Sequence, residues 1–249
     1  MRIIFLGTNG WYNTNIANTA CIFLETEDCY IIFDAGDGFY KIDKFIKENK
    51  PIYLFLSHFH LDHITGLHTL NKFNFSQGIK IYGPPGMEKA IGEIICSPYS
   101  VDLNRLSYHV DLVEIEEGRH NLPFFLECRL LTHSVSTFGY RIKIEDCIVS
   151  YCSDTGVCEN AIELSRSVDL VMCECSLKSG QSNEDWPHLN PQTAARIAKD
   201  ASAKRLALIH FNPYFYPSLN ERVLAEEEAK KIFANTFQAK DDMEIQIGH

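Results

Sequence analysis

The sequence contains no long hydrophobic segment. None of its apolar runs approaches the roughly 18 residues that a membrane-spanning helix requires, which excludes integral insertion into a membrane. The apolar stretch from Ile3 to Leu6 is too short for a secretory signal peptide. Linker-like, low-complexity and repeated segments are also missing. We therefore expect residues 1–249 to form a single domain without a membrane partner.

The cysteine pattern lacks the pairing of a disulfide framework. The chain has nine cysteines, an odd number, and none is followed by another cysteine three positions later. Most of them sit in apolar runs, such as Ile148–Cys152 and Val171–Cys173. This pattern predicts buried free thiols in a reducing compartment, and hence a cytoplasmic location.

Basic residues are scarce relative to acidic ones. The chain has 23 lysines and arginines against 33 aspartates and glutamates, for a formal net charge of −10. Such a chain repels polyanions on average, which speaks against broad binding of nucleic acid. Bound divalent cations can reverse the sign of the charge locally, so a phosphate-containing substrate is still compatible with this composition.

Short apolar runs of strand length recur along the whole chain, with helical patterns between them. The strand-like runs are residues 2–6, 20–25, 30–33, 51–56, 79–82, 110–115, 124–131, 138–144, 147–151, 168–173, 205–209 and 243–247. The helical patterns are residues 38–49, 64–72, 87–96, 158–166, 191–202 and 219–235. This organisation predicts a layered α/β sandwich.

Several of the strand-like runs end in a residue type that binds metals. The residues in question are Asp34, His58, His133, Asp154, Glu174 and His210. A single histidine at the end of a strand is usually an ordinary core residue. Because ligands gather where the carboxyl ends of strands meet loops, six repetitions favour one polar site built from distant segments.

The densest cluster runs from His58 to His63 and reads H-x-H-x-D-H, with His60 and Asp62 between its ends. Neutral imidazoles and a carboxylate suit zinc, and they also accept manganese or iron. Four potential ligands in six residues exceed what one ion usually takes from one loop, so we expect two divalent metal ions. A cluster of surface histidines is the alternative.

This motif, together with His133, Asp154 and His210 in the same order, resembles the metallo-β-lactamase fold over the whole chain. The resemblance implies an αβ/βα four-layer sandwich of two mixed sheets with helices outside. It also implies that His58, His60 and His133 hold the first ion, that Asp62, His63 and His210 hold the second, and that Asp154 bridges both. Asp34 lies beyond this set, and we expect it to support the signature loop by hydrogen bonding. An ordinary turn aspartate is the alternative.

Other segments resemble the phosphodiesterase branch of this fold, and ribonuclease Z in particular. By that resemblance His188, in the run Asp185–Leu189, donates a proton to the leaving group, and Glu174 orients and charges the imidazole. Asp62 is expected to act in catalysis as well as in metal binding. Ser134 and Thr137, close to His133, are weaker candidates for binding a phosphate.

The sequence departs from the long-armed ribonuclease Z pattern between His133 and Asp154. Only 154 − 133 = 21 positions separate these residues, which is enough for one hairpin but not for a basic tRNA-binding arm. With the negative net charge, this departure places tRNA binding in doubt.

We therefore expect a two-metal hydrolase, a phosphodiesterase that uses a metal-bridging hydroxide. A lactonase or thioesterase on the same metal centre is the alternative enzyme, and a metal-holding scaffold is the alternative without catalysis. The substrate is a phosphodiester or another ester. The resemblance also suggests a homodimer. Trp11, Tyr99 and the aromatic run Phe211–Pro217 are candidates for the rim of the site.

Overall fold

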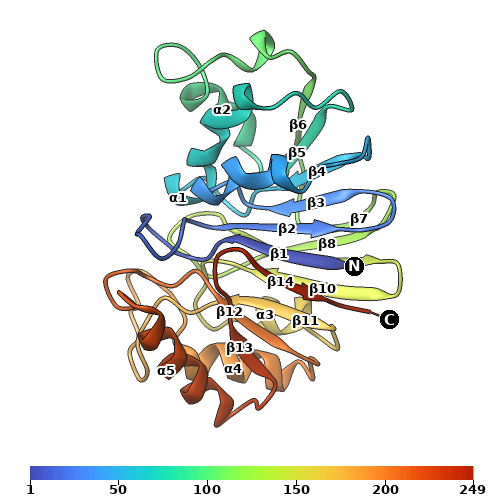
Figure 1. Cartoon of the computed structure of the whole chain (residues 1–249). Helices are drawn as coiled ribbons and strands as arrows, with labels where there is room; N and C mark the ends of the chain where they lie inside the picture. Colours follow the sequence, from blue (N-terminus) through green and yellow to red (C-terminus); the bar gives the residue numbers. More distant parts are fainter. Residues whose placement is uncertain (249) are drawn as a thin grey trace.

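The computed structural model describes residues 1–248. Within them the strands form two sheets of seven, with helices on both outer surfaces (Figure 1). The first sheet has the order β14 (Met243–Gln246), β1 (Arg2–Gly7), β2 (Cys21–Glu25), β3 (Tyr30–Phe33), β4 (Ile52–Phe55), β5 (Ile79–Gly83) and β6 (Val110–Glu114). The second has the order β13 (Thr236–Gln238), β12 (Leu206–Ile209), β11 (Leu170–Glu174), β10 (Cys147–Cys152), β9 (Phe138–Ile144), β8 (Phe125–Leu130) and β7 (Gly118–Asn121).

Both sheets are mixed. In the first, β14, β1, β2 and β3 pair antiparallel, whereas β3 to β6 pair parallel. In the second, β10 to β13 pair parallel and β7 to β10 pair antiparallel. The four-layer αβ/βα sandwich of two mixed sheets is thereby confirmed.

The helices divide into two groups that cover opposite outer faces (Figure 1). The connections between strands of the first sheet contain the 3-10 helices η1 (Asp37–Lys44), η2 (Thr65–Lys72) and η3 (Leu103–Arg105) and the helices α1 (Leu61–Ile64) and α2 (Met87–Ile94). The second sheet is covered by α3 (Glu159–Leu164), α4 (Pro191–Asp200) and α5 (Leu219–Lys230). Within the described residues, no helix has the length and apolar character needed to cross a membrane.

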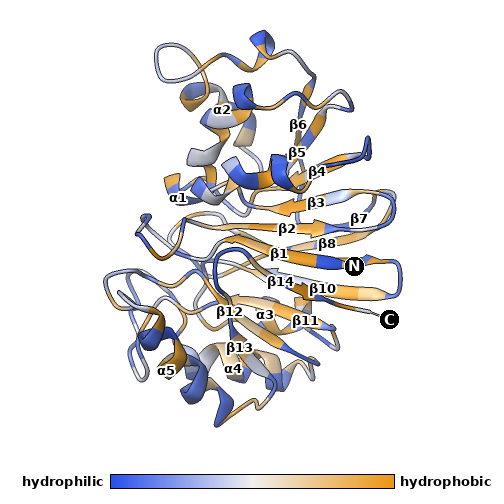
Figure 2. Ribbon diagram, in the orientation of Figure 1, coloured by the Kyte–Doolittle hydropathy of each residue, from blue (hydrophilic) through white to orange (hydrophobic). Residues whose placement is uncertain are grey.

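Alternation along the strands builds separate hydrophobic clusters on the two faces of each sheet. On β1, Phe5 points into the cluster between the sheets, whereas Ile4 and Leu6 belong to the cluster beneath the helices of the first layer. The rings of Phe33 and Tyr151 stack across the sandwich with centroids 4.8 Å apart. Most strand residues are hydrophobic, as the orange ribbons of Figure 2 show, and burial of their side chains stabilises the packing of the layers.

The segments that differ from the sequence-based expectation lie at the margins of the layers. The helix expected over 38–49 is wrong in type and length, since the chain forms the shorter 3-10 helix η1 there. This helix packs closely on β1, where a Cβ on Gly38 would lie 2.5 Å from the carbonyl oxygen of Leu6. The helix expected over 64–72 begins earlier, as α1, and continues as η2. Strands β7 and β13 were not anticipated, because β7 has no apolar residue and β13 is only three residues long.

The turn after β1 is fixed by a buried charge network. Asp241 accepts hydrogen bonds from the backbone N–H of Thr8 (3.0 Å) and of Asn18 (2.9 Å). It also accepts one from Nζ of Lys41 (3.2 Å), whose side chain is almost fully buried. Further along this turn the backbone N–H of Gly10 donates to the carbonyl oxygen of Phe211 (3.0 Å), and a Cβ on Gly10 would lie 2.3 Å from the ring carbon Cε1 of His210.

Candidate metal centre

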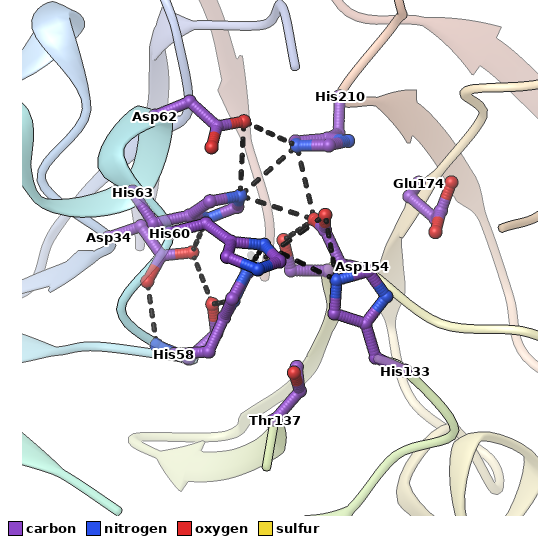
Figure 3. Close-up of polar contacts among 12 residues, drawn as sticks. Asp34, His58, His60, Asp62, His63, His133, Thr137, Asp154, Glu174 and His210 are labelled. Carbon is purple, nitrogen blue, oxygen red and sulfur yellow. Dashed lines mark hydrogen bonds and ion pairs between the residues drawn. The ribbon is translucent and has the colours of Figure 1, made fainter. Parts of the chain in front are cut away.

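The predicted ligands follow strands of both sheets, and their side chains converge on one cluster (Figure 3). The loop after β4 carries His58 and His60, and the short helix α1 carries Asp62 and His63. From the second sheet, His133 follows β8, Asp154 follows β10 and His210 follows β12. Seven side chains that are up to 152 positions apart in the sequence thus meet in one cluster.

One group of four donors consists of His58, His60, His133 and Asp154. Nδ1 of His60 lies 2.9 Å from Nε2 of His58 and 3.4 Å from Nε2 of His133. Oδ2 of Asp154 lies 4.0 Å from Nε2 of His58 and 3.7 Å from Nε2 of His133. The four residues offer donor atoms that all lie within 4.8 Å of one another, close enough to hold a single ion.

The second group consists of Asp62, His63 and His210, and it faces the other oxygen of Asp154. Nε2 of His63 and Nε2 of His210 lie 3.1 Å apart. Oδ2 of Asp62 lies 3.5 Å from the first of these nitrogens and 3.3 Å from the second. Oδ1 of Asp154 lies 3.2 Å from His63 Nε2 and 3.1 Å from His210 Nε2. Asp154 therefore presents one oxygen to each group, the arrangement of a carboxylate that can bridge two ions.

Asp34 supports one histidine of each group, His63 directly and His58 through Ser57. Its Oδ2 lies 2.7 Å from Nδ1 of His63 and also accepts hydrogen bonds from Ser57 Oγ (2.8 Å) and the Tyr151 hydroxyl (2.6 Å). Because the Ser57 hydroxyl donates to Asp34, its oxygen can accept from Nδ1 of His58, 3.0 Å away. The supporting position expected for Asp34 is where the structure places it, and its φ of 56° is tolerated by aspartate.

Two further ligand histidines, His210 and His133, also have a hydrogen-bond partner at Nδ1, the ring nitrogen that faces away from the cluster. Nδ1 of His210 lies 3.1 Å from Oγ of Ser176, which donates to the His210 carbonyl oxygen (2.9 Å), so the ring nitrogen is the donor. Nδ1 of His133 lies 3.3 Å from the carbonyl oxygen of Pro187. Fixing Nδ1–H in this way leaves Nε2 unprotonated and directed into the cluster, as in known metal sites.

The histidines of the first group are held in the form that binds a metal. Burial lowers the pKa of His58, His60 and His133 below the ordinary value for histidine, despite the opposing charge of Asp154. Neutral imidazole offers a nitrogen lone pair, whereas imidazolium offers none. The donor set of this group therefore fits a divalent cation.

The second group carries an excess of negative charge. Burial alone would lower the pKa of His63, but the carboxylates of Asp62, Asp154 and Asp34 raise it well above its ordinary value. Three carboxylates around one imidazole require a compensating positive charge. A divalent cation supplies that charge and displaces the proton, so this group also fits a metal ion.

Beside the cluster, His188 and Glu174 form a hydrogen-bonded pair. Nδ1 of His188 lies 2.6 Å from Oε1 of Glu174, and Nε2 lies 4.0 Å from Oδ2 of Asp154. Burial by itself would lower the pKa of His188, but the charge and hydrogen bond of Glu174 outweigh it and raise the pKa to about 9. Glu174 is fully buried and also accepts from the backbone N–H of Thr155 (2.7 Å). The protonated imidazole thus points its Nε2 towards the cluster.

A cavity of about 610 Å³ opens over the two groups. Its lining includes Trp11 and Phe215, which were expected at the rim, whereas Tyr99 lines a different hollow. Neither Ser134 nor Thr137 lines the cavity. Ser134 is exposed elsewhere, and Thr137 is buried with its hydroxyl donating to the carbonyl oxygen of Val135 (3.0 Å), so the structure does not bring these two hydroxyls to the cavity.

Three residues that hold the ligand side chains in place were not identified from the sequence. They are Ser57, Tyr151 and Ser176, which orient Asp34 and the ligand histidines. The positions of Ser57 and Ser176, next to or near a predicted site residue, were the only available signal. Tyr151 is 117 positions from Asp34, so nothing in the local pattern relates the two.

The two stacked sheets and the paired ligand groups define a metallo-β-lactamase fold. The chain belongs to the beta-lactamase superfamily, because the model of the beta-lactamase superfamily domain matches residues 30–211. In sequence it is similar to ribonuclease Z of Crocosphaera subtropica, with 27% identity over 311 aligned positions that cover 99% of this chain and 98% of the relative. The alignment is longer than this chain of 249 residues, so the relative carries residues that have no counterpart here.

Solved structures share the same fold. The metallo-beta-lactamase fold protein YhfI from Bacillus subtilis superposes with a TM-score of 0.83 at 22% identity, covering 98% of each chain. The short form of human tRNase Z superposes with a TM-score of 0.79 at 23% identity, covering 100% of each chain. In this chain the segment from His133 to Asp154 contains only the β9–β10 hairpin, as the sequence predicted.

Proposed function

We infer that this protein is a metal-dependent phosphodiesterase. The observation that carries the inference is Asp154, which faces one ligand group with each of its oxygens, next to the His188–Glu174 pair. Sequence relatives named ribonuclease Z support the same reaction class. They do not favour the acyl hydrolase considered as the alternative, a lactonase or thioesterase on the same centre.

We assign the first ion to His58, His60 and His133, and the second to Asp62, His63 and His210, with Asp154 between them. Zinc suits this nitrogen-rich donor set best, and manganese or iron fits it as well. When bound, two such ions would lower the pKa of coordinated water and neutralise negative charge on a phosphoryl group.

The remaining steps belong to side chains of this protein. His188 holds a proton on Nε2, beside the cluster, and donates it to the oxygen that leaves phosphorus. Glu174 holds Nδ1–H and stabilises the imidazolium before the transfer. We also propose that Asp62, besides facing the second ion, accepts a hydrogen bond from the attacking water and orients it.

The test is hydrolysis of bis(p-nitrophenyl) phosphate by the full chain loaded with zinc or manganese. We expect turnover that is lost in Asp154→Asn, because an amide cannot offer two anionic oxygens to two ions. A lactone and a thioester serve as parallel substrates. The inference is wrong if protein with two bound ions hydrolyses an acyl ester but no phosphodiester.

Three broader expectations accompany this function. We propose that the chain works as one hydrolytic domain, since both sheets supply ligands to one cluster. We propose a cytoplasmic location, which the nine free cysteines support. A homodimer is also proposed, from the family resemblance, and light scattering of the purified protein tests it.

A further inference from the structure

The wall of the cavity above the ligand cluster is aromatic and neutral. Apart from the groups that face the ions, its lining contributes the side chains of Trp11, Leu61, Leu177, Asn183, Trp186, Asn212 and Phe215. Within residues 1–248, this lining contains no lysine or arginine. The neighbouring Lys178 is turned away, because its ammonium group pairs with Glu221 and lies over the ring of Tyr216. Apart from the imidazolium of His188, which is assigned to the leaving group at the cluster, the cavity offers no fixed cation that could hold a second phosphate.

The only two tryptophans of the chain both line this cavity. Trp11 is 65% exposed and Trp186 is 48% exposed, which is unusual for the largest apolar side chain. The indole of Trp186 stacks on the ring of His60 with an interplanar angle of 11° and centroids 5.5 Å apart. The backbone N–H of Trp11 donates to Oδ2 of Asp62 (2.6 Å). The indole of Trp186 and the backbone of Trp11 are thus each tied to a residue of the cluster, and both tryptophans present uncovered ring surface in the cavity.

Two asparagines on the same wall have free amide donors. Oδ1 of Asn183 accepts from the backbone N–H groups of Asp185 (3.1 Å) and Trp186 (3.0 Å), and Oδ1 of Asn212 accepts from the N–H of Tyr214 (2.9 Å). These bonds fix which end of each amide faces the backbone, and within the described chain neither Nδ2 group has a hydrogen-bond partner. Neutral N–H donors of this kind suit the carbonyl oxygens and ring nitrogens of a base.

We propose that the cavity takes a compact phosphodiester with one phosphate and one nucleobase, whose base packs on the indoles of Trp11 and Trp186 with its polar edge against Asn183 and Asn212. This inference rests on the proposed function, because the phosphate is placed at the ligand cluster. Stacking on an aromatic side chain accepts any base, so the site selects a nucleobase without selecting a sequence. A longer strand finds no lysine or arginine in this lining to hold its additional phosphates.

The two tryptophans also supply the test, since no other indole contributes to the fluorescence of the protein. Zinc-loaded full chain is titrated with adenosine 5′-monophosphate and with ribose 5-phosphate, which share the phosphate and differ in the base. We expect the adenine compound to quench the fluorescence and to bind about 5- to 150-fold more tightly, the range that stacking of one base provides. Trp11→Phe and Trp186→Phe each leave one indole as reporter and keep an aromatic ring, so both should retain the preference.

The control variants separate stacking from general loss of structure. Trp11→Ala and Trp186→Ala should each reduce the preference for the adenine compound. Tyr99→Ala, which removes an exposed aromatic ring outside the cavity, should leave it unchanged. Circular dichroism establishes that each variant is folded. Equal affinity for the two compounds in the unmodified protein would overturn the inference.

Two further readouts distinguish the failures. If bis(p-nitrophenyl) phosphate is hydrolysed but the base adds no affinity, the proposed function stands and the nucleobase site is wrong. If no phosphodiester is hydrolysed, the proposed function itself fails. A compact substrate contacts one phosphate, so the logarithm of the binding constant should fall with the logarithm of the salt concentration with a slope of only about −0.7. A single-stranded RNA oligomer that binds much more tightly than a dinucleotide, with a much steeper salt dependence, would also overturn the inference.

Discussion

Two buried serines offer a matched test of how the ligand histidines are held. Ser57 Oγ contacts Nδ1 of His58 in the first ligand group, and Ser176 Oγ contacts Nδ1 of His210 in the second. Neither hydroxyl belongs to the donor atoms of an ion. We predict that Ser57→Ala weakens binding of the first ion and that Ser176→Ala weakens binding of the second.

The size of the effect follows from the burial of these groups. Metal binding requires Nε2 of each ring to face the cluster, which fixes Nδ1–H towards the position of the lost hydroxyl. His58 is 0% exposed and His210 is 4% exposed, so water cannot replace the acceptor freely. An unsatisfied buried donor costs about 1–3 kcal/mol. At about 1.4 kcal/mol for a tenfold change, the affinity of the affected ion should fall by about 5- to 150-fold.

The assay is competition between the protein and a chromogenic zinc chelator, which resolves two dissociation constants. Anomalous diffraction from crystals at limiting zinc shows which ion each variant retains. Each serine variant should lose one ion, and a different one. Loss of the same ion from both variants, or no change in either constant, would refute the role given to the outer hydrogen bonds.

Three other substitutions test separate parts of the structure. His188→Ala should lower kcat about 10²- to 10⁴-fold for a diester with an alkoxide leaving group and much less for a p-nitrophenyl ester, and an equal loss on both would contradict its role as proton donor. Gly10→Ala places a Cβ 2.3 Å from the ring of His210, so metal analysis should find the second ion depleted in a protein that is still folded, and full retention of both ions would refute the contact. Asp241→Ala removes one of the two carboxylates beside the buried ammonium of Lys41, while Asp242 stays 3.0 Å from it, and it also removes the acceptor of the Thr8 and Asn18 N–H groups. It should lower the free energy of unfolding in urea by about 1–3 kcal/mol, and an unchanged free energy would contradict the role given to this network.

Much of the site could be predicted because its chemistry is concentrated at strand ends. The motif from His58 to His63 is local, and Asp154 and His210 each follow a strongly apolar strand. The fold places the carboxyl ends of these strands at one edge, so the pattern in the sequence becomes proximity in space. The His188–Glu174 contact was expected from family resemblance, and the structure brings the two side chains to hydrogen-bonding distance.

The parts that could not be predicted depend on contacts without a local pattern. The Tyr151 hydroxyl meets Asp34 across the sandwich, although its position in β10 indicates only an ordinary core residue. Ser134 and Thr137 adjoin a ligand in the chain, but the β8–β9 connection turns their hydroxyls to solvent or to the backbone. Proximity along the chain is therefore a poor guide where a loop reverses direction.

The division of the ligands between the two sheets gives bound ions a second consequence. His58 and Asp62 belong to the half of the molecule built on the first sheet, whereas His133, Asp154 and His210 belong to the other half. An ion in either group links the two halves, so the sheets cannot separate unless the ion is released. When the concentration of free ion is a thousand times its dissociation constant, one such ion adds about 4 kcal/mol to the free energy of unfolding. Metal starvation would then shorten the lifetime of this protein in the presence of proteases, so its abundance as well as its turnover would follow the supply of metal.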